Sequence, residues 1–132
     1  CTDGQVLEWD TSTETGAWIC KTAVAGATSI DELSDGKTGG DSVALGPNAG
    51  TNDDQTSNRN TFIGTASGRD STTGYYNVAV GYGSLLSNIG GSANTSVGNS
   101  SMWYNTSGVR NVAVGANSMQ MITTADDNTA TG

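Results

Sequence analysis

The sequence is dominated by a five-residue segment that returns at every seventeenth position. Residues 77–81 (Asn-Val-Ala-Val-Gly) are its clearest copy. The copies begin at Asn60, Asn77, Asn94, Asn111 and Asn128. The glycines that close them are Gly64, Gly81, Gly98, Gly115 and Gly132, and Gly46 closes an earlier copy, residues 42–46. The interval from Gly46 to Gly64 is longer by one position, which implies an insertion in the loop between them. A fixed short period indicates a solenoid, and this one is too short for a helix pair or a propeller blade.

We predict an all-β chain whose residues 42–132 form a parallel β-solenoid with one repeat in each coil. Stacked parallel strands lie about 4.8 Å apart. The repeated asparagines would then form an amide ladder, each side chain bonding to those above and below. The closing glycines would supply backbone freedom at a tight corner.

Alternation along each short strand places its first and third residues on one face and the second on the other. In residues 78–80 this separates the two valines from Ala79. The second position is small in Ala44, Ala79, Ser96, Ala113 and Ala130, which predicts a narrow space behind it. Phe62 violates this rule, and the repeat pattern does not explain it.

Length and hydrophobic content together favour self-association. The 132 residues correspond to one domain, or to one domain with an appendage. Only 34% of them are hydrophobic, so each coil offers few apolar side chains and a single stack would leave an apolar flank exposed. Burying apolar surface gains about 25 cal/mol per Å², and a second copy of the chain is the simplest partner.

The net charge of −8 makes nucleic acids and anionic membranes poor partners. No stretch is long and apolar enough to insert into a bilayer. Because the sequence opens on Cys1 without a signal peptide, we expect a processed form or a piece of a longer protein.

The segment before the repeats, residues 1–41, differs from them in composition. Residues 1–20 are predicted to form a β-hairpin closed by a Cys1–Cys20 disulfide, because β-prone runs flank a polar turn and the cysteines stand near opposite ends. A disulfide implies an oxidising, extracellular setting. The alternative is a lipid-bearing Cys1 with Cys20 unpaired. Residues 21–41 are interpreted as a connector, with a capping box at residues 29–32 that predicts a brief helical turn.

Catalytic and metal-binding patterns are weak. The chain has no histidine, which removes the usual general base and the commonest zinc ligand. We predict no enzymatic activity and no cofactor. Residues 64–68 superficially suggest a nucleophile elbow, but Ser67 belongs to a column of small residues in the repeat. Two loop pairs are weak calcium candidates, and we interpret them as solvated acids: Asp53, Asp54, Asp126 and Asp127.

Five aromatic residues are predicted to lie near the turns of the middle coils: Tyr75, Tyr76, Tyr82, Trp103 and Tyr104. Exposed aromatics on a rigid polar stack suit contact with a cell-surface glycan or protein receptor. The alternative, which we favour at this point, is that they seal the edges between coils or the contact between protomers.

The motif Asn-Thr/Val-Ala-Val-Gly-x-x-Ser-Leu/Met, with Asn-Thr-x-Gly at residues 105–108, resembles the head repeats of trimeric autotransporter adhesins. It resembles even more the related repeats of phage and prophage tail fibres, and residues 3–20 resemble a segment common in such fibres. The resemblance implies a left-handed β-roll in a homotrimer on a virion or a bacterial surface.

The expected function is therefore a structural or adhesive module of an extracellular trimeric fibre that attaches to a host or a surface. One alternative is a self-assembling filament subunit that joins end to end through open strand edges at Ser42 and Asn128. The other is a polysaccharide depolymerase, which would need paired carboxylates. Only Asp70 lies within the coils outside the two loop pairs.

Overall fold

A computed structural model describes residues 5–10, 17–22, 36–39, 41–54, 56 and 58–132, with side chains from residue 41 onward. These residues form strands and turns, without a helix, so no described helix could cross a membrane. Strands β1 (Gln5–Asp10) and β2 (Ala17–Thr22) pair antiparallel as the predicted hairpin. The predicted disulfide, which involves Cys1, and the predicted helical turn both fall outside the described residues.

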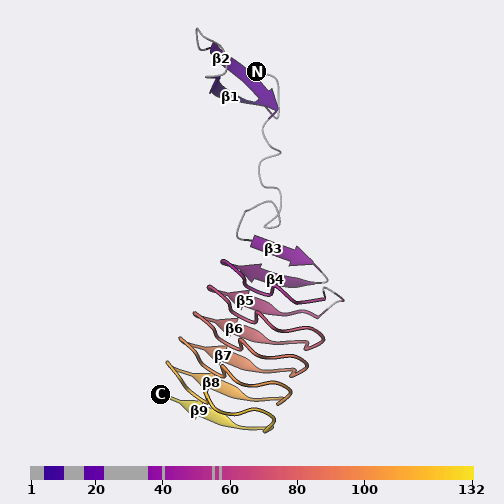
Figure 1. Ribbon diagram of the computed structural model, residues 1–132, viewed down its shortest axis with the longest axis vertical. Helices are drawn as coiled ribbons and strands as arrows, with labels where there is room; N and C mark the ends of the chain where they lie inside the picture. The colour runs from indigo at the N-terminus through magenta and orange to yellow at the C-terminus, as the bar shows by residue number, and fades with distance from the viewer. Residues whose placement is uncertain (1–4, 11–16, 23–35, 40, 55, 57) are drawn as a thin grey trace.

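The repeats form one seven-stranded sheet in the order of the sequence. Its strands are β3 (Gly36–Gly39), β4 (Ser42–Leu45), β5 (Thr61–Ile63), β6 (Val78–Val80), β7 (Thr95–Val97), β8 (Val112–Val114) and β9 (Thr129–Thr131). From β4 to β9 all neighbours are parallel, and Ala79 pairs with Ser96 and Ser96 with Ala113, one repeat apart. The stack of coils in Figure 1 therefore confirms the predicted parallel β-solenoid.

Strand β3 corrects one expectation about the ends of the stack. It pairs antiparallel with β4, so that Gly39 lies opposite Ser42 and Gly36 opposite Leu45. The edge at Ser42, which we expected to be open, is thus occupied by a segment assigned to the connector. Direct addition of another coil to β4 would have to displace β3, so β3 and not β4 is the edge strand at this end of the sheet.

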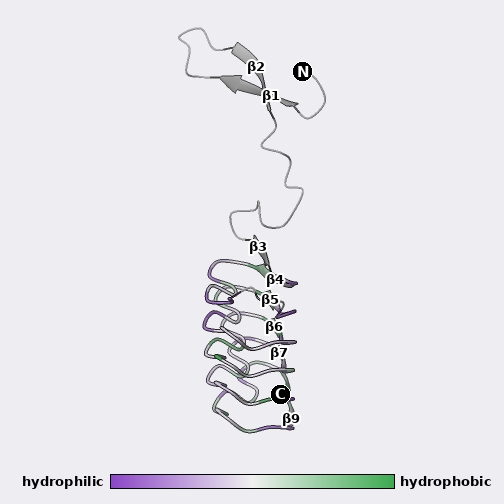
Figure 2. Cartoon of the chain, turned by 90° about the vertical axis from the view of Figure 1, so that its right-hand side faces the viewer, coloured by the Kyte–Doolittle hydropathy of each residue, from purple (hydrophilic) through white to green (hydrophobic). Residues whose placement is uncertain are grey.

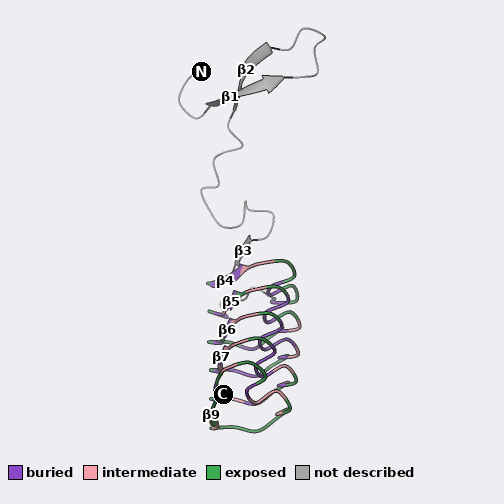
Figure 3. Ribbon diagram, turned by 90° about the vertical axis from the view of Figure 1, so that its left-hand side faces the viewer, coloured by how far each residue is buried: buried purple, intermediate pink, exposed green. Residues whose placement is uncertain are grey.

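The interior of the coils is narrow. The middle residue of each strand points inward, and Phe62, Ala79 and Ala113 are fully buried. Leu85 and Met102 fill the space from the opposite turn and are also fully buried. The same alternation of buried and exposed residues recurs from coil to coil (Figure 3). The small second position predicted from the repeat therefore faces the core, and the valines beside it face outward.

Phe62 fits because the turns that face it carry glycine at the position where later coils carry a large apolar side chain. Gly50 and Gly68 occupy the positions that Leu85 and Met102 hold in later repeats. A Cβ at Gly68 would lie 2.6 Å from Cζ of Phe62, and one at Gly50 would lie 2.9 Å from Cδ2 of the same ring. At Phe62 the large core side chain comes from the strand, whereas at Leu85 and Met102 it comes from the turn. The volume of the core is therefore conserved, as close packing requires.

This exchange predicts a compensated double variant. Gly68→Leu should lower the free energy of unfolding by about 3 kcal/mol or more through overpacking, and Phe62→Ala should lower it by about 3 to 5 kcal/mol through a cavity. The double variant should lose less than the sum of the two, because Leu85 shows that the turn backbone accepts leucine at a φ of 50°. A double-mutant cycle by urea unfolding measures this coupling, and strict additivity would contradict the exchange.

Candidate functional site

The repeated asparagines lie directly above one another in the interior of the stack. Asn94 Oδ1 accepts hydrogen bonds from the backbone N–H of Asn111 (3.0 Å) and from its Nδ2 (3.2 Å). Asn94 Nδ2 donates to the carbonyl oxygen of Gly108 at 2.8 Å. Equivalent bonds tie each asparagine to the next, and Ser42 Oγ takes the asparagine's place above Asn60. The side chains thus bond to backbone groups as well as to one another. The bond to the carbonyl oxygen, such as that from Asn94 to Gly108, joins two segments of the same coil.

The closing glycines from Gly46 to Gly115 stand where an added Cβ would collide with the backbone of the next coil. At Gly98 the backbone φ is +136°, and a Cβ would lie 2.6 Å from the carbonyl carbon of Gly115 on the next coil. The φ values of Gly46, Gly64, Gly81 and Gly115 lie between 118° and 128°. These turns need glycine both for its conformation and for the close approach of two backbones.

A second, shorter asparagine ladder of two residues lies beside the first and was not predicted. Asn105 Nδ2 donates to Asn88 Oδ1 at 3.0 Å, and both side chains are fully buried. Asn88 also donates to the carbonyl of Gly91, the same oxygen that accepts from Asn77. The repeated Asn-x-x-Gly at residues 88–91 and 105–108 was the available signal. In the coils of Asn88 and Asn105 the interior is therefore polar as well as narrow.

Buried serines in the column of small residues form hydrogen bonds to the backbone of the next coil. Ser67 Oγ donates to the carbonyl of Ala79 at 2.9 Å, and Ser84 Oγ donates to that of Ser96 at 2.9 Å. Both serines are fully buried. Ser67 is therefore a structural cross-brace, and it offers no hydroxyl to a substrate.

The five predicted aromatics divide into two groups. Tyr75 and Tyr76 contact each other edge to face, with ring centroids 5.3 Å apart. Tyr82 and Trp103 lie 6.0 Å apart, and Trp103 lies 6.4 Å from Tyr104. No ring contact joins the two groups among the aromatic residues that the structure describes. All four tyrosines are about half exposed, so they do not seal the coils of a single chain.

The Tyr75–Tyr76 group is tied into a column of surface side chains. Arg59 lies one repeat before Tyr76, donates to its hydroxyl at 2.6 Å and has its guanidinium 5.5 Å from the ring centroid. Arg59 also pairs with Asp41 at 3.5 Å. These contacts hold the Tyr76 ring against its neighbours on both sides, which leaves it less free to receive a ligand than the other group.

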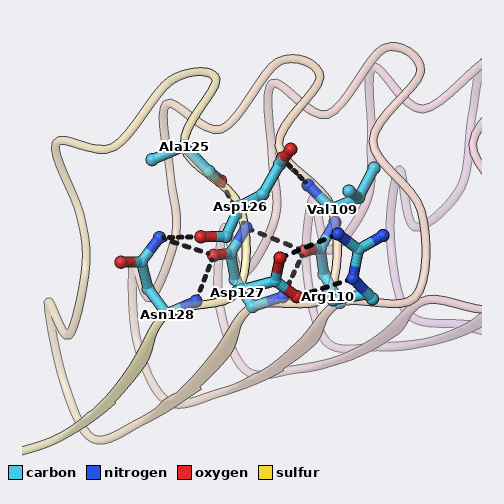
Figure 4. Close-up of polar contacts among 8 residues, drawn as sticks. Val109, Arg110, Ala125, Asp126, Asp127 and Asn128 are labelled. Carbon is cyan, nitrogen blue, oxygen red and sulfur yellow. Dashed lines mark hydrogen bonds and ion pairs between the residues drawn. The ribbon is translucent and has the colours of Figure 1, made fainter.

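The same column ends in a second ion pair, shown in Figure 4. Arg110 donates two hydrogen bonds to the carboxylate of Asp127, at 2.6 and 2.8 Å. The hydrogen bonds and the charge of Arg110 lower the pKa of Asp127, which stays ionised further into the acid range than an ordinary aspartate. Asp126 Oδ1 accepts from the backbone N–H of Val109 at 2.8 Å. Both acids are thus used to join the last two coils.

The other acidic pair also has structural partners. Asp53 is buried and accepts from the amides of Asn58 (2.6 Å) and Asn60 (3.4 Å), so it is not the solvated acid that we expected. Asp54 accepts from the backbone N–H and the hydroxyl of Thr56, and these bonds lower its pKa. In the part of the chain that the structure describes, no three His, Cys, Asp or Glu side chains come together as a metal site.

Asp70, the remaining acid of the coils, is engaged by the residue beside it. Its carboxylate accepts two hydrogen bonds from Arg69, each at 2.9 Å. Asp53 and Asp54 accept hydrogen bonds from asparagine and threonine side chains, so each of these three carboxylates has a structural partner.

No protein-family model matches the chain, and neither a curated protein nor a solved structure is similar enough to count as a match. Function must therefore be inferred from the geometry of the solenoid and from the repeat motif. That geometry provides a stiff stack, an outward strand face and exposed aromatic turns.

Proposed function

We propose that this chain is a structural and adhesive module of an extracellular trimeric fibre, on a phage tail or a bacterial surface. The observation that carries the proposal is the outward face of the strands, which line one side of the stack (Figure 2). Two columns of aligned side chains cover this face: Val43, Thr61, Val78, Thr95, Val112 and Thr129 in one, and Leu45, Ile63, Val80, Val97, Val114 and Thr131 in the other. Eight of these twelve residues are Val, Leu or Ile and four are Thr, and a largely apolar face this regular is unusual on a monomer.

The exposed residues of this face are the kind that association buries. Ile63 is 39% exposed and Val114 is 43% exposed in the single chain. Neighbouring strands repeat the same shape every coil, so a second copy can pack along the whole length of the stack. We propose three copies in a left-handed β-roll, because the repeat motif resembles that of trimeric fibres. We further propose a Cys1–Cys20 disulfide, which would suit an extracellular protein.

The proposed role is mechanical and multivalent. The ladder from Asn60 to Asn128 ties each of its coils to the next, and the hydroxyls of Ser67 and Ser84 add bonds between coils, which favours a rigid rod over a flexible linker. Three identical, parallel copies would present the same turns together, and linked sites gain avidity without a tight single contact. The asparagines of the ladders and the acids of the loops are engaged in structural bonds, which supports attachment over catalysis.

Val97→Asp is expected to abolish the trimer without unfolding the coil. Val97 lies in the middle of the outward face and is half-buried in the single chain, so a carboxylate there keeps contact with water in the monomer and loses it on association. Burying an unpaired carboxylate costs several kcal/mol, and about 1.4 kcal/mol corresponds to a tenfold change in affinity. Sedimentation equilibrium should give three chain masses for the native protein and one for the variant.

Ser107→Asp is the matched control, because it adds the same charge to an exposed loop position. It should leave the mass at three chains. A native protein that sediments as a monomer at micromolar concentration, or a Val97→Asp variant that remains trimeric, would contradict the proposed assembly.

A further inference from the structure

The surface of the repeats departs from its own pattern at Tyr82, Trp103 and Tyr104. The other coils carry Pro47, Thr65, Asn99 and Ala116 in the column of Tyr82, and Thr51, Arg69, Leu86 and Gln120 in that of Trp103. Trp103 contacts both tyrosine rings at separations typical of favourable aromatic pairs. Tyr82 remains 53% exposed and Tyr104 46% exposed, so the group forms a continuous accessible patch.

Gly83 shows that the position of the Trp103 ring is built into the coil. A Cβ at Gly83 would lie 2.6 Å from Cε3 of the indole and closer still to Cζ3. The column of Gly83 does not need glycine for its backbone, because Ala66, Ser100 and Asn117 adopt the same φ of 54° to 58°. Glycine is therefore needed at position 83 to leave room for the indole of Trp103, which lies against the backbone of the preceding coil.

Polar side chains stand beside the aromatic patch. Arg69 and Asp70 lie two repeats before Trp103 and Tyr104 in the same two columns, and hydrogen bonds link the coils between them. Their ion pair is bidentate, and the side chain of Arg69 is 44% exposed. The patch thus combines a fixed indole, two phenol hydroxyls and a nearby charged pair, about 10 Å away along the stack.

We propose that Tyr82, Trp103 and Tyr104 bind a hexopyranose unit of a surface polysaccharide. The C–H face of a pyranose ring is apolar and stacks on indole and phenol rings, while its hydroxyl groups need donors and acceptors at the rim. Tyrosine and tryptophan provide rigid amphipathic contact area at low entropy cost. The Trp103 ring is already held by its fit against Gly83, so little ordering remains when the sugar binds.

The patch is separate from the proposed trimer contact. The three aromatics follow the closing glycines, on the turn segments, whereas the apolar columns precede the glycines on the strands. The patch therefore lies outside the strand face through which we propose that the copies associate. The proposal deepens the proposed function by naming its receptor class, and it rests on that function for its biological setting.

The test is glycan binding by the full chain. Native protein is screened on an array of neutral and acidic oligosaccharides, and the strongest binder is titrated calorimetrically. Trp103→Ala should weaken binding at least about tenfold, because a stacking platform is lost. Gly83→Ala should also weaken binding while the protein stays folded, because alanine fits this column at Ala66 but displaces the indole.

Tyr76→Ala is the matched control, since it removes an exposed aromatic from the other group and Ala93 adopts the same φ in its column. Its affinity should stay within twofold of native. Absence of glycan binding, binding only to a protein receptor, or a Trp103→Ala variant that binds normally would overturn the proposal. So would loss of the trimer on Trp103→Ala. A monomeric native protein whose glycan binding depends on Trp103 would overturn the fibre and leave the site standing.

Discussion

Gly98→Ala is expected to destabilise the solenoid more than an alanine at a neighbouring position of the same turn. The added Cβ would meet the carbonyl carbon of Gly115 at 2.6 Å, and backbone atoms cannot rotate away as a side chain can. The φ of +136° adds strain of its own for any L-residue. We expect the free energy of unfolding to fall by about 4 kcal/mol or more. Urea unfolding at fixed protein concentration measures the change.

Ser100→Ala serves as the control for this prediction. It lies in the same turn as Gly98 and also has a positive φ, but Ala66 occupies the equivalent position in an earlier coil. The free energy of unfolding should change by less than about 1 kcal/mol. If Gly98→Ala proved equally mild, the close stacking of the closing turns would be refuted.

Asn94→Ala is expected to have the second large effect. It leaves the backbone N–H of Asn111, inside the stack, without its acceptor. It also removes the hydrogen bond from Asn94 Nδ2 to the Gly108 carbonyl, which keeps a hydrogen bond from Asn105 Nδ2 at 3.2 Å. A buried polar group left without a partner costs about 1 to 3 kcal/mol and a lost hydrogen bond about 0.5 to 1.5 kcal/mol, so the total loss should be about 1.5 to 4.5 kcal/mol. Because coils are coupled to their neighbours only, amide exchange should accelerate most in β7 and β8.

Asn128→Ala provides the comparison at the last described coil. Asn128 is half-buried, and its side chain donates to Asn111 and to the exposed carbonyl of Asp126. Water can replace these partners, so the loss should be less than about 1 kcal/mol. Equal losses at Asn94 and Asn128 would mean that the ladder contributes little beyond local turn preference.

The architecture was accessible from the sequence because its cause is periodic. Every coil must place the same groups above those of the coil before, so Asn60, Asn77 and Asn94 recur at the spacing of one turn. The narrow core was equally accessible, because the second strand position tolerates only small residues when the opposite turn contributes Leu85 or Met102. Parallel pairing at one repeat confirms that interpretation.

Three features could not be obtained from the spacing alone. The exchange of Phe62 with Gly50 and Gly68 depends on which segments face each other across the core, which a repeat pattern does not specify. The pairing of β3 with β4 is a single event outside the period. The left-handed backbone at Leu85 carries no glycine, so nothing in the residue type announced it.

The separation of the aromatic residues into two groups is a further feature that the spacing did not predict. In sequence Tyr75, Tyr76 and Tyr82 are neighbours, and Trp103 is remote. One turn of the solenoid brings Trp103 against Tyr82, whereas Tyr76 lies at the column of Arg59 and is held by it. The sequence placed all five aromatics near the turns of the middle coils without dividing them, and the structure separates them into two groups.

The central claim is that residues one repeat apart are vertical neighbours in a wound parallel sheet. Nuclear Overhauser contacts between the backbone protons of Ala79, Ser96 and Ala113 test it most directly, since parallel partners lie about 4.8 Å apart. We expect contacts from Ala79 to Ser96 and from Ser96 to Ala113, with none from Ala79 to Ala113. Contacts in the pattern of antiparallel hairpins, with one residue number rising as the other falls, would contradict the solenoid.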